Sequence, residues 1–447
     1  MKESIKKRIE AVRRGEVPEG YSTEHAMLFP DEWGTPVALN TVLSENKDRN
    51  EGLRFDKEDV LSVSGEQGIV NQIDLLGRSY AGESVAPYHV VETGDVVYTK
   101  SPLKESPYGI IKQNRGVPGI VSTLYAVYHC STPITGQYLE NYFCIDTYLN
   151  NYLKPLVKRG AKNDMKVNNE EVLLGRIPLP SLQEQERINE IIAQFNRMIE
   201  RKQIKIDELK KLKQVCLLEM FPQKGQTIPQ RRFPGFSAPW EQRKFDEVFD
   251  CTVPNNTLSR AELSYDEGTV LNVHYGDVLI KYGSVLDVQK DDIPRIPHRC
   301  REDFNGALLQ DGDVIIADTA EDETTGKACE IGNLQGCAIV SGLHTMVCRP
   351  RHRMALGYLG YYLNSNAYHN QLLPLMQGIK VLSLSRSNIQ KTSVSYPSAV
   401  KEQQFIASYF SQLDNLITLH QRELAEVGKY KKALMQLLLA GLVRVNA

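Results

Sequence analysis

Three short groups of residues have the types and spacing that could support chemistry. Pro30-Asp31 followed by Glu45-Asn46-Lys47 fits the loose pattern of metal-dependent nucleases, in which carboxylates and a lysine converge on one Mg²⁺. Glu321–Glu323 is an acidic run, and Thr325–Lys327 ends like a phosphate-binding loop. We expect none of them to be a site: the first lies in a turn-rich loop, the second suits a solvated loop and the third lacks the upstream glycine. A self-contained nuclease using Asp31, Glu45 and Lys47 stays as an alternative.

Other catalytic motifs are absent from the sequence. It has no GxGxxG, no GxxxxGK[ST], no HExxH and no Asn/Asp-Pro-Pro-Tyr/Phe, the element that holds a flipped adenine in amino-methyltransferases. The eight cysteines are scattered without a CxxC pair, which favours reduced thiols over a zinc site. We therefore expect a recognition or assembly component with no catalytic residue and no metal.

Composition and charge are those of an ordinary globular protein. A net charge of −2 argues against a protein that coats nucleic acid indiscriminately, although a local basic surface fits a neutral total. The sequence has no run of 18 apolar residues, and residues 1–17 indicate a charged amphipathic helix rather than a signal peptide. We expect a cytoplasmic protein that contacts no membrane.

A long helix with one apolar stripe is predicted after Pro180, and a second one follows Pro397. Alternate steps of four and three residues define an a/d seam with period 3.5. The first seam contains Ile188, Ile192, Phe195, Ile199, Ile206 and Leu209, with breaks at Lys202 and Lys213. Adding 218 gives the second, Ile406, Phe410, Leu413, Ile417, Leu424 and Val427, with breaks at His420 and Lys431. The shared breaks indicate an internal repeat rather than two unrelated core helices.

The segments before the two helices repeat as well. Trp33 matches Trp240, Gly94-Asp95-Val96 matches Gly312-Asp313-Val314, and the order of further matching pairs is kept. Between these positions the two halves differ almost completely. The sequence therefore predicts an α+β protein built by tandem duplication. Its predicted parts are a domain over 1–180 with a helical leader, a helix over 181–222, a second domain over 223–397 and a helix over 398–447.

The repeated helices must bury their seams, and each is the natural partner of the other. An antiparallel pair would give the chain a pseudo-twofold axis and would hold two unlike domains at a fixed spacing. Each helix of about 38 residues would be about 57 Å long. The alternative is that each helix only closes its own domain.

Two unlike domains at a fixed spacing suit DNA, whose groove faces recur with each turn. Such a reader needs cations for phosphates and variable polar loops for base edges. In the first domain the candidates are Ser64, Gln67, Asn71, Lys100, Lys104, Lys112 and Arg115. In the second they are His274, Tyr275, Lys281, Arg295, Arg299, Arg301 and Lys327.

Several fragments together resemble the specificity subunits of type I restriction–modification enzymes. They are Ile177–Pro180, Gln183–Ile188, Arg232–Phe236, Pro239–Glu241, Val273–Asp277 and Lys401–Gln404. The resemblance covers nearly the whole chain. The first half departs from the pattern, since it has Ser64–Gly68 where the second half has His274–Asp277.

The resemblance implies a fold and a set of partners. The fold would be two target-recognition domains separated by two antiparallel helices, reading a bipartite, asymmetric sequence in double-stranded DNA. Two modification subunits would dock on the helices, bind S-adenosylmethionine and methylate adenine. Restriction subunits would supply ATP- and Mg²⁺-dependent translocation and cleavage, and this chain would hold no cofactor. A coiled-coil scaffold that binds only proteins stays as a second alternative.

Overall fold

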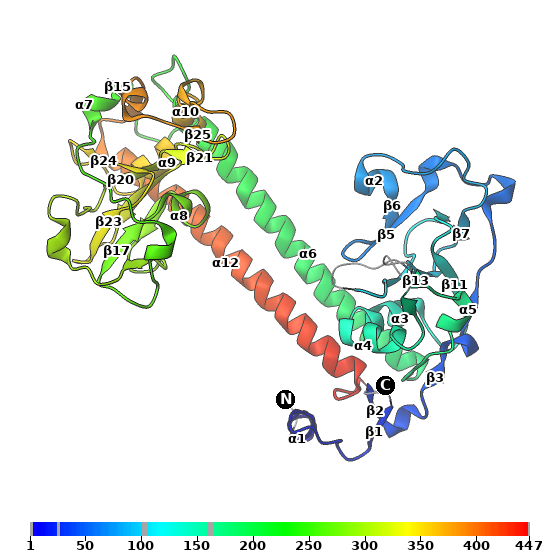
Figure 1. The fold of residues 1–447 in the computed structure, drawn as a ribbon. Coiled ribbons are helices and arrows are strands. Elements are labelled where there is room, and N and C mark those ends of the chain that lie inside the picture. Colours follow the sequence, from blue (N-terminus) through cyan, green and yellow to red (C-terminus); the bar gives the residue numbers. More distant parts are fainter. Residues whose placement is uncertain (1–2, 25–26, 101–105, 160–164, 446–447) are drawn as a thin grey trace. The chain divides into compact units, whose positions relative to one another are not determined.

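A computed structural model describes residues 3–24, 27–100, 106–159 and 165–445, which form two compact units (Figure 1). Unit 1 comprises residues 1–201 and 424–447, and unit 2 comprises residues 202–423. The long helices α6 (Leu182–Glu219) and α12 (Val400–Leu439) each contribute one part to either unit. No helix of the described residues is long and apolar enough to cross a membrane.

Unit 1 contains short strands and helices before α6. The helices are α1 (Glu3–Arg13), α2 (Gln72–Leu76), α3 (Gly136–Phe143), α4 (Asp146–Leu153) and α5 (Asn169–Val172). The first seven strands are β1 (Tyr21–Glu24), β2 (Met27–Pro30), β3 (Val37–Ala38), β4 (Leu43–Glu45), β5 (Leu61–Ser64), β6 (Gly68–Asn71) and β7 (His89–Val91). The others are β8 (Val96–Tyr98), β9 (Ile111–Gln113), β10 (Gly119–Val121), β11 (Ala126–Cys130), β12 (Lys158–Arg159), β13 (Met165–Lys166) and β14 (Arg176–Ile177).

Unit 2 repeats this kind of architecture between the two long helices. Its helices are α7 (Phe245–Val248), α8 (Tyr275–Ile280), α9 (Tyr358–Leu363), α10 (Asn366–His369) and α11 (Arg386–Ile389). Its first six strands are β15 (Glu241–Lys244), β16 (Phe249–Asp250), β17 (Val270–Val273), β18 (Val285–Asp287), β19 (Arg295–Ile296) and β20 (Val314–Ala317). The others are β21 (Thr319–Ala320), β22 (Ala328–Gly332), β23 (Ala338–Ser341), β24 (Thr345–Pro350), β25 (Leu382–Ser383) and β26 (Ser393–Tyr396).

The central sheets of the two units have the same strand order. Unit 1 has β4-β11-β8-β9, and unit 2 has β16-β24-β20-β22 with β18 added beside β22. In both, a helix pair follows the second strand of this order, α3–α4 after β11 and α9–α10 after β24. The middle strands β8 and β20 are buried along their whole length, as their continuous apolar sequences require. The α+β class and the internal repeat are thus confirmed.

Each domain is closed by a pair of strands at its base. In unit 1, β3 pairs antiparallel with β14, so that Val37 faces Ile177. In unit 2, β15 pairs antiparallel with β26, so that Glu241 faces Tyr396. Because β14 and β26 lead directly into α6 and α12, each pair brings the start of a domain beside the helix that follows it.

The long helices pack antiparallel. In unit 2, Lys202 Nζ lies 2.8 Å from Glu423 Oε2, and Lys213 Nζ lies 2.5 Å from Asp414 Oδ1. Residue numbers therefore increase along α6 in the direction in which they decrease along α12. In the same unit Leu209 of α6 shares one apolar core with four seam residues of α12, Ile406, Phe410, Leu413 and Ile417. In unit 1, Ile188 and Ile192 share a core with Met435, Leu438 and Leu439. Ile206 is also buried, whereas Phe195, Ile199, Leu424 and Val427 are half-buried.

Candidate nucleic-acid interface

A buried glutamate near the start of each long helix fixes the helix to its own domain. In unit 2, the Arg232 guanidinium donates to both carboxylate oxygens of Glu402 at 2.7 and 2.8 Å, and Trp240 Nε1 donates to the same carboxylate at 3.3 Å. In unit 1, the Arg444 guanidinium donates to both carboxylate oxygens of Glu184 at 2.7 and 2.9 Å, and the indole of Trp33 donates to the same carboxylate at 3.0 Å. We call each set an Arg–Glu–Trp clamp. The two clamps explain why the tryptophans recur at equivalent places in the sequence.

The residue after each clamp glutamate is a buried glutamine with an equivalent role. Gln185 Nε2 donates to the carbonyl of Pro180 and its Oε1 accepts from Thr135 N. Gln403 Nε2 donates to the carbonyl of Pro397 and its Oε1 accepts from Ala355 N. Each glutamine therefore ties the helix entry to the loop that precedes α3 or α9, and the direction in which each helix leaves its domain is determined by buried polar contacts.

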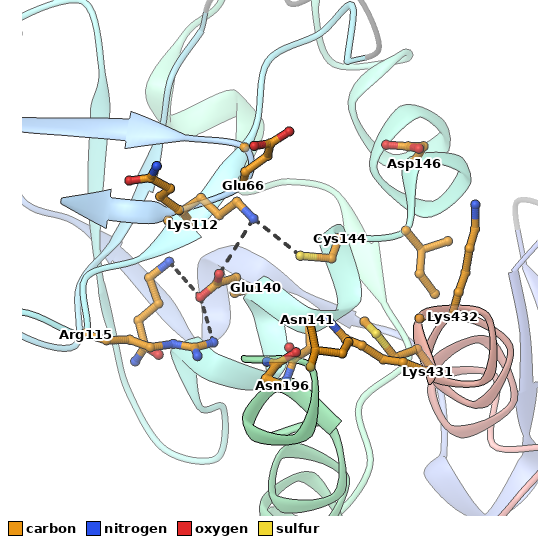
Figure 2. Close-up of a pocket in the computed structure, with 18 of the residues that line it drawn as sticks. Glu66, Lys112, Arg115, Glu140, Asn141, Cys144, Asp146, Asn196, Lys431 and Lys432 are labelled. Atoms are coloured by element: carbon orange, nitrogen blue, oxygen red, sulfur yellow. Dashed lines mark hydrogen bonds and ion pairs between the residues drawn. The ribbon is translucent and has the colours of Figure 1, made fainter. Parts of the chain in front are cut away.

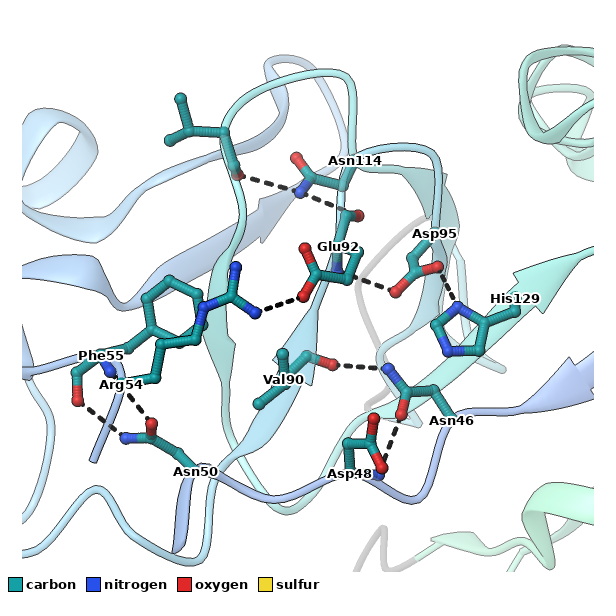
Figure 3. A network of polar contacts seen from close by, with 11 residues as sticks. Asn46, Asp48, Asn50, Arg54, Phe55, Val90, Glu92, Asp95, Asn114 and His129 are labelled. Atoms are coloured by element: carbon teal, nitrogen blue, oxygen red, sulfur yellow. Dashed lines mark hydrogen bonds and ion pairs between the residues drawn. The ribbon is translucent and has the colours of Figure 1, made fainter. Parts of the chain in front are cut away.

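The repeated Gly-Asp turns are also part of the framework. Asp95 accepts from Glu92 N and from His129 Nδ1, within a network that includes Asn46 and Asn114 (Figure 3). Asp313 accepts from Gln310 N and forms an ion pair with Arg349. In both units the aspartate closes its turn and bonds to a cationic or imidazole side chain on the neighbouring strand, so these matching residues position loops rather than form a reading surface.

The loops carried by this framework differ between the units. In unit 2, α8 starts at the buried His274, whose Nδ1 accepts from Gly276 N, and burial lowers the pKa of this imidazole. The ring of Tyr275 contacts that of His274 in a tilted arrangement and that of His344 edge to face, with ring centroids 4.6 and 5.3 Å away. In unit 1 the corresponding strand β5 turns into β6 instead, and Ser64 Oγ accepts from the amides of Glu66 and Gln67 in that turn.

A second cluster in unit 2 combines cations with an exposed aromatic ring. Arg260 Nη2 and Lys281 Nζ both donate to the hydroxyl of Tyr265, at 2.6 and 3.3 Å. Asp277 and Asp292 pair with the two cations. A basic–aromatic cluster of this kind can contact phosphates with its cations and a base or sugar with its ring. Sequence reasoning singled out Lys281 alone, because Arg260 and Tyr265 lie in a stretch without a recognisable motif.

The candidate DNA-contacting residues fall into two groups. One group is exposed, or half-buried with part of its polar surface accessible: Ser64, Gln67, Arg115, Tyr275, Lys281, Arg295, Arg299 and Arg301. The other is engaged in the framework: Asn71 caps α2, Lys100 bonds Asn169, Lys112 is buried beside Glu140, His274 caps α8, and Lys327 donates to the carbonyls of Leu279 and Tyr282. Lys104 lies outside the described residues. Their roles toward DNA stay predictions.

Sequence reasoning also passed over an exposed pair in unit 1. The guanidinium of Arg78 lies 4.6 Å from the ring centroid of Tyr80, whose side chain is 58% exposed. The only signal in the sequence was an arginine two residues before a tyrosine in a polar loop. Such a pair offers a cation and a stacking surface at one place.

The nuclease alternative finds no support in the geometry. Lys47 Nζ lies 2.9 Å from Glu170 and 3.8 Å from Glu45, so two of the three candidates are in contact. Glu45 also accepts from Asn169, and Asp31 accepts from Ser22. Within the described ranges, no group of three or more His, Cys, Asp or Glu side chains is placed to hold a metal ion. The acidic run Glu321–Glu323 is exposed.

Comparisons with known proteins agree on one family. Residues 238–429 match the family model "Type I restriction modification DNA specificity domain". The type I restriction enzyme MjaVIII specificity subunit of Methanocaldococcus jannaschii is 24% identical over 281 residues, covering 61% of this chain and 63% of the relative. The putative MjaX specificity subunit of the same organism is 22% identical over 310 residues, covering 66% of this chain and 65% of the relative. The matches thus span slightly less than two thirds of either relative.

Two solved structures share the fold. A chain from work on complex assembly and conformational transition of the type I R-M system has a TM-score of 0.52 at 18% identity, covering 97% of this chain and all of that one. The S subunit of the type I restriction–modification system of M. genitalium has a TM-score of 0.50 at 10% identity, covering 90% of this chain and 95% of that one.

Proposed function

We propose that the chain is a specificity subunit of a type I restriction–modification enzyme and selects the DNA sequence on which partner subunits act. The match of residues 238–429 to the DNA specificity domain of that family and the similarity to curated specificity subunits support this proposal. Each unit would read one half of a bipartite, asymmetric target, and the helix pair would set the gap between the halves. One observation carries this proposal: the two units share strand order, Gly-Asp turns and Arg–Glu–Trp clamps but differ in the loops that the framework presents. A common frame with unlike loops suits two readers of two unlike half-sites.

The proposal includes the division of the chain. The target-recognition domains are residues 1–180 and 223–397, and the spacer helices occupy 181–222 and 398–447. The chain itself is non-catalytic. S-adenosylmethionine, ATP and Mg²⁺ would be bound by modification and restriction subunits, so that a target adenine is flipped into a partner's pocket.

Exposed apolar side chains of the long helices support docking of two modification subunits. In unit 2 the exposed side chains off the seam include Ile204, Leu212, Val215, Leu218, Phe405, Leu416 and Leu419. In unit 1 they include Met198 and Tyr430. Apolar side chains repeated along a helix surface are typical of a protein interface.

An exchange of domains within the chain tests the proposal. The paired strands at the base of each domain define the joints: residues 245–392 lie between β15 and β26, and residues 39–175 lie between β3 and β14. A chain that carries 245–392 in both places should direct methylation to a target whose two halves are inverted copies of one sequence, with the gap kept. The matched control is the reverse exchange, which should duplicate the other half-site. If either chain, folded and bound to its modification partner, kept the original asymmetric target, the proposal would be wrong.

A further inference from the structure

Positions on α6 and α12 are related in pairs, because the seam of α12 repeats the seam of α6 with an offset of 218 residues. By this repeat, position i of α6 and position j of α12 are equivalent to positions j − 218 of α6 and i + 218 of α12. The ion pair of Lys213 with Asp414 in unit 2 therefore corresponds to Lys431 and Asn196 in unit 1. The lysine is kept in the repeat, but its carboxylate partner is replaced by a neutral amide.

In unit 2 the charge of Lys213 is compensated by an ion pair with Asp414. Lys213 Nζ lies 2.5 Å from Asp414 Oδ1 and 5.5 Å from the ring centroid of Tyr361. The Tyr361 hydroxyl donates to the other oxygen of Asp414 at 2.9 Å. The ammonium, the carboxylate and the phenol thus form one satisfied group beside a cavity of about 820 Å³.

In unit 1 the equivalent lysine is half-buried at the wall of a cavity. Lys431 and Asn196 line a cavity of about 730 Å³ enclosed by the β5–β6 turn, α3, the start of α4 and the two long helices (Figure 2). Among the residues that the structure describes, no carboxylate lies within ion-pair distance of Lys431. Burial lowers the pKa of this ammonium, and nearby Lys112 and Arg115 lower it further, against the opposing effects of Cys144 and Glu140.

The nearby charges do not replace the missing partner. Glu140 lies 3.7 Å from Lys112 and 2.9 Å from Arg115, so one carboxylate is shared by two cations. Lys432 adds an exposed ammonium at the same cavity, while Glu66 and Asp146 are exposed at its edge. The inner part of the cavity therefore has more cations than anions, which is a setting for a bound anion.

We propose that this cavity is a phosphate-binding site, in which Lys431 contacts an oxyanion that takes the place held by Asp414 in unit 2. The cavity is far larger than one carboxylate needs and falls in the range of small-molecule sites of about 300–1,000 Å³. A phosphate offers several acceptor oxygens to the Lys431 ammonium, and Lys432 lines the same cavity, whereas Arg115 is already paired with Glu140. The phosphate could belong to a small free molecule or to the DNA backbone. The cavity includes the β5–β6 turn, Lys112 and Arg115, which are also candidate DNA contacts. A DNA-backbone phosphate at this site therefore rests on the proposed function, whereas binding of a free phosphate does not.

Calorimetric titration of the full chain tests the site, with inorganic phosphate and pyrophosphate as probes at constant ionic strength. Asn196→Asp should supply the missing carboxylate and weaken phosphate binding at least about tenfold, which corresponds to about 1.4 kcal/mol. Lys431→Gln should weaken it as much. Lys429→Gln is the matched control, because Lys429 is an exposed lysine of the same helix that pairs with Glu426 and lies away from the cavity.

A duplex-DNA titration of the same variants distinguishes the two sources of phosphate. Loss of phosphate and pyrophosphate binding with unchanged DNA affinity indicates a small ligand. Weaker DNA binding in both Asn196→Asp and Lys431→Gln, without binding of the free ions, indicates the DNA backbone. If neither probe nor duplex responds to these substitutions, or if Lys429→Gln has the same effect, the site does not exist.

Folding of the variants is checked by an independent readout. Asn196→Asp should raise the melting temperature of the chain, because it forms the ion pair that unit 2 already has. Asp414→Asn provides the reciprocal test: it leaves Lys213 without its carboxylate beside the 820 Å³ cavity and should create phosphate binding in unit 2. A stable Asp414→Asn chain that gains no phosphate binding would contradict the idea that the missing carboxylate makes the site.

Discussion

Removal of the arginine from the Arg–Glu–Trp clamp of unit 2 should destabilise that unit strongly and selectively. In Arg232→Met the carboxylate of Glu402, whose side chain is 1% exposed, keeps only the Trp240 indole as a side-chain donor, at 3.3 Å. Leaving one charge of a buried pair without its partner costs about 3–5 kcal/mol. With a urea m-value of about 2–3 kcal/mol/M, the midpoint of unit 2 should fall by about 1–2.5 M.

The unfolding of each unit can be followed separately by tryptophan fluorescence, because each of the two tryptophans of the chain belongs to one clamp. In a Trp33→Phe background, fluorescence of Trp240 follows the unfolding of unit 2, and in a Trp240→Phe background Trp33 follows unit 1. Arg232→Met should shift the first transition and leave the second unchanged. Arg444→Met should do the reverse with a smaller shift, because Arg444 is more exposed than Arg232, at 17% against 11%.

The double variant Arg232→Met, Glu402→Gln separates loss of the pair from loss of packing. It removes the buried charge together with its partner and should regain more than half of the lost stability. A free energy of unfolding within about 1 kcal/mol of the parent for Arg232→Met, or a double variant as unstable as the single one, would refute the assignment of a buried, charge-compensated clamp.

Three further predictions follow from other features. Burial raises the pKa of Glu330 to about 7, so its contribution to stability is full below its ordinary pKa of 4.5 and is lost as the pH rises through 7; Glu330→Gln should stabilise unit 2 at pH 8 by up to about 3 kcal/mol and have little effect at pH 4, measured by urea unfolding. Deletion of 201–207 together with the facing residues 419–425 shortens both helices by about 10 Å and should reduce the gap between half-sites by about three base pairs or abolish binding, whereas an unchanged gap in methylation mapping would contradict the spacer role. Arg295→Gln, Arg299→Gln and Arg301→Gln should each reduce the slope of log binding constant against log salt by about 1, whereas Lys327→Gln should lower stability and leave the slope unchanged, because its ammonium is held by two carbonyls.

The framework could be inferred from the sequence because it is repeated within the chain. Ile188 with Ile406 and Trp33 with Trp240 recur in the same order, and period 3.5 is a direct consequence of helix pairing. The clamps could not be inferred, since Glu184 meets Trp33 across 151 residues and Arg444 across 260. Only the folded chain shows that each repeated tryptophan contacts a glutamate near the start of the long helix that follows its domain.

Burial accounts for most of what sequence reasoning could not resolve in the candidate interface. A lysine in a polar stretch is exposed by default, but Lys112 is buried and Lys327 is half-buried with its ammonium on two carbonyls. His274 lies in a fragment that resembles specificity subunits, but its imidazole caps a helix. The replacement of Asp414 by Asn196 in the repeat was visible in the sequence, but its meaning required the pairing of α6 with α12 and the cavity beside Lys431.

Two unlike units on one helix pair should read two unlike half-sites. Mapping of adenine methylation in cells that produce this chain with its modification partner, compared with cells lacking the chain, tests it directly. Methylation should be confined to a motif of two different half-sites separated by a gap of fixed length, and it should be lost without the chain. Methylation of a continuous palindrome, or methylation that persists when the chain is absent, would contradict it.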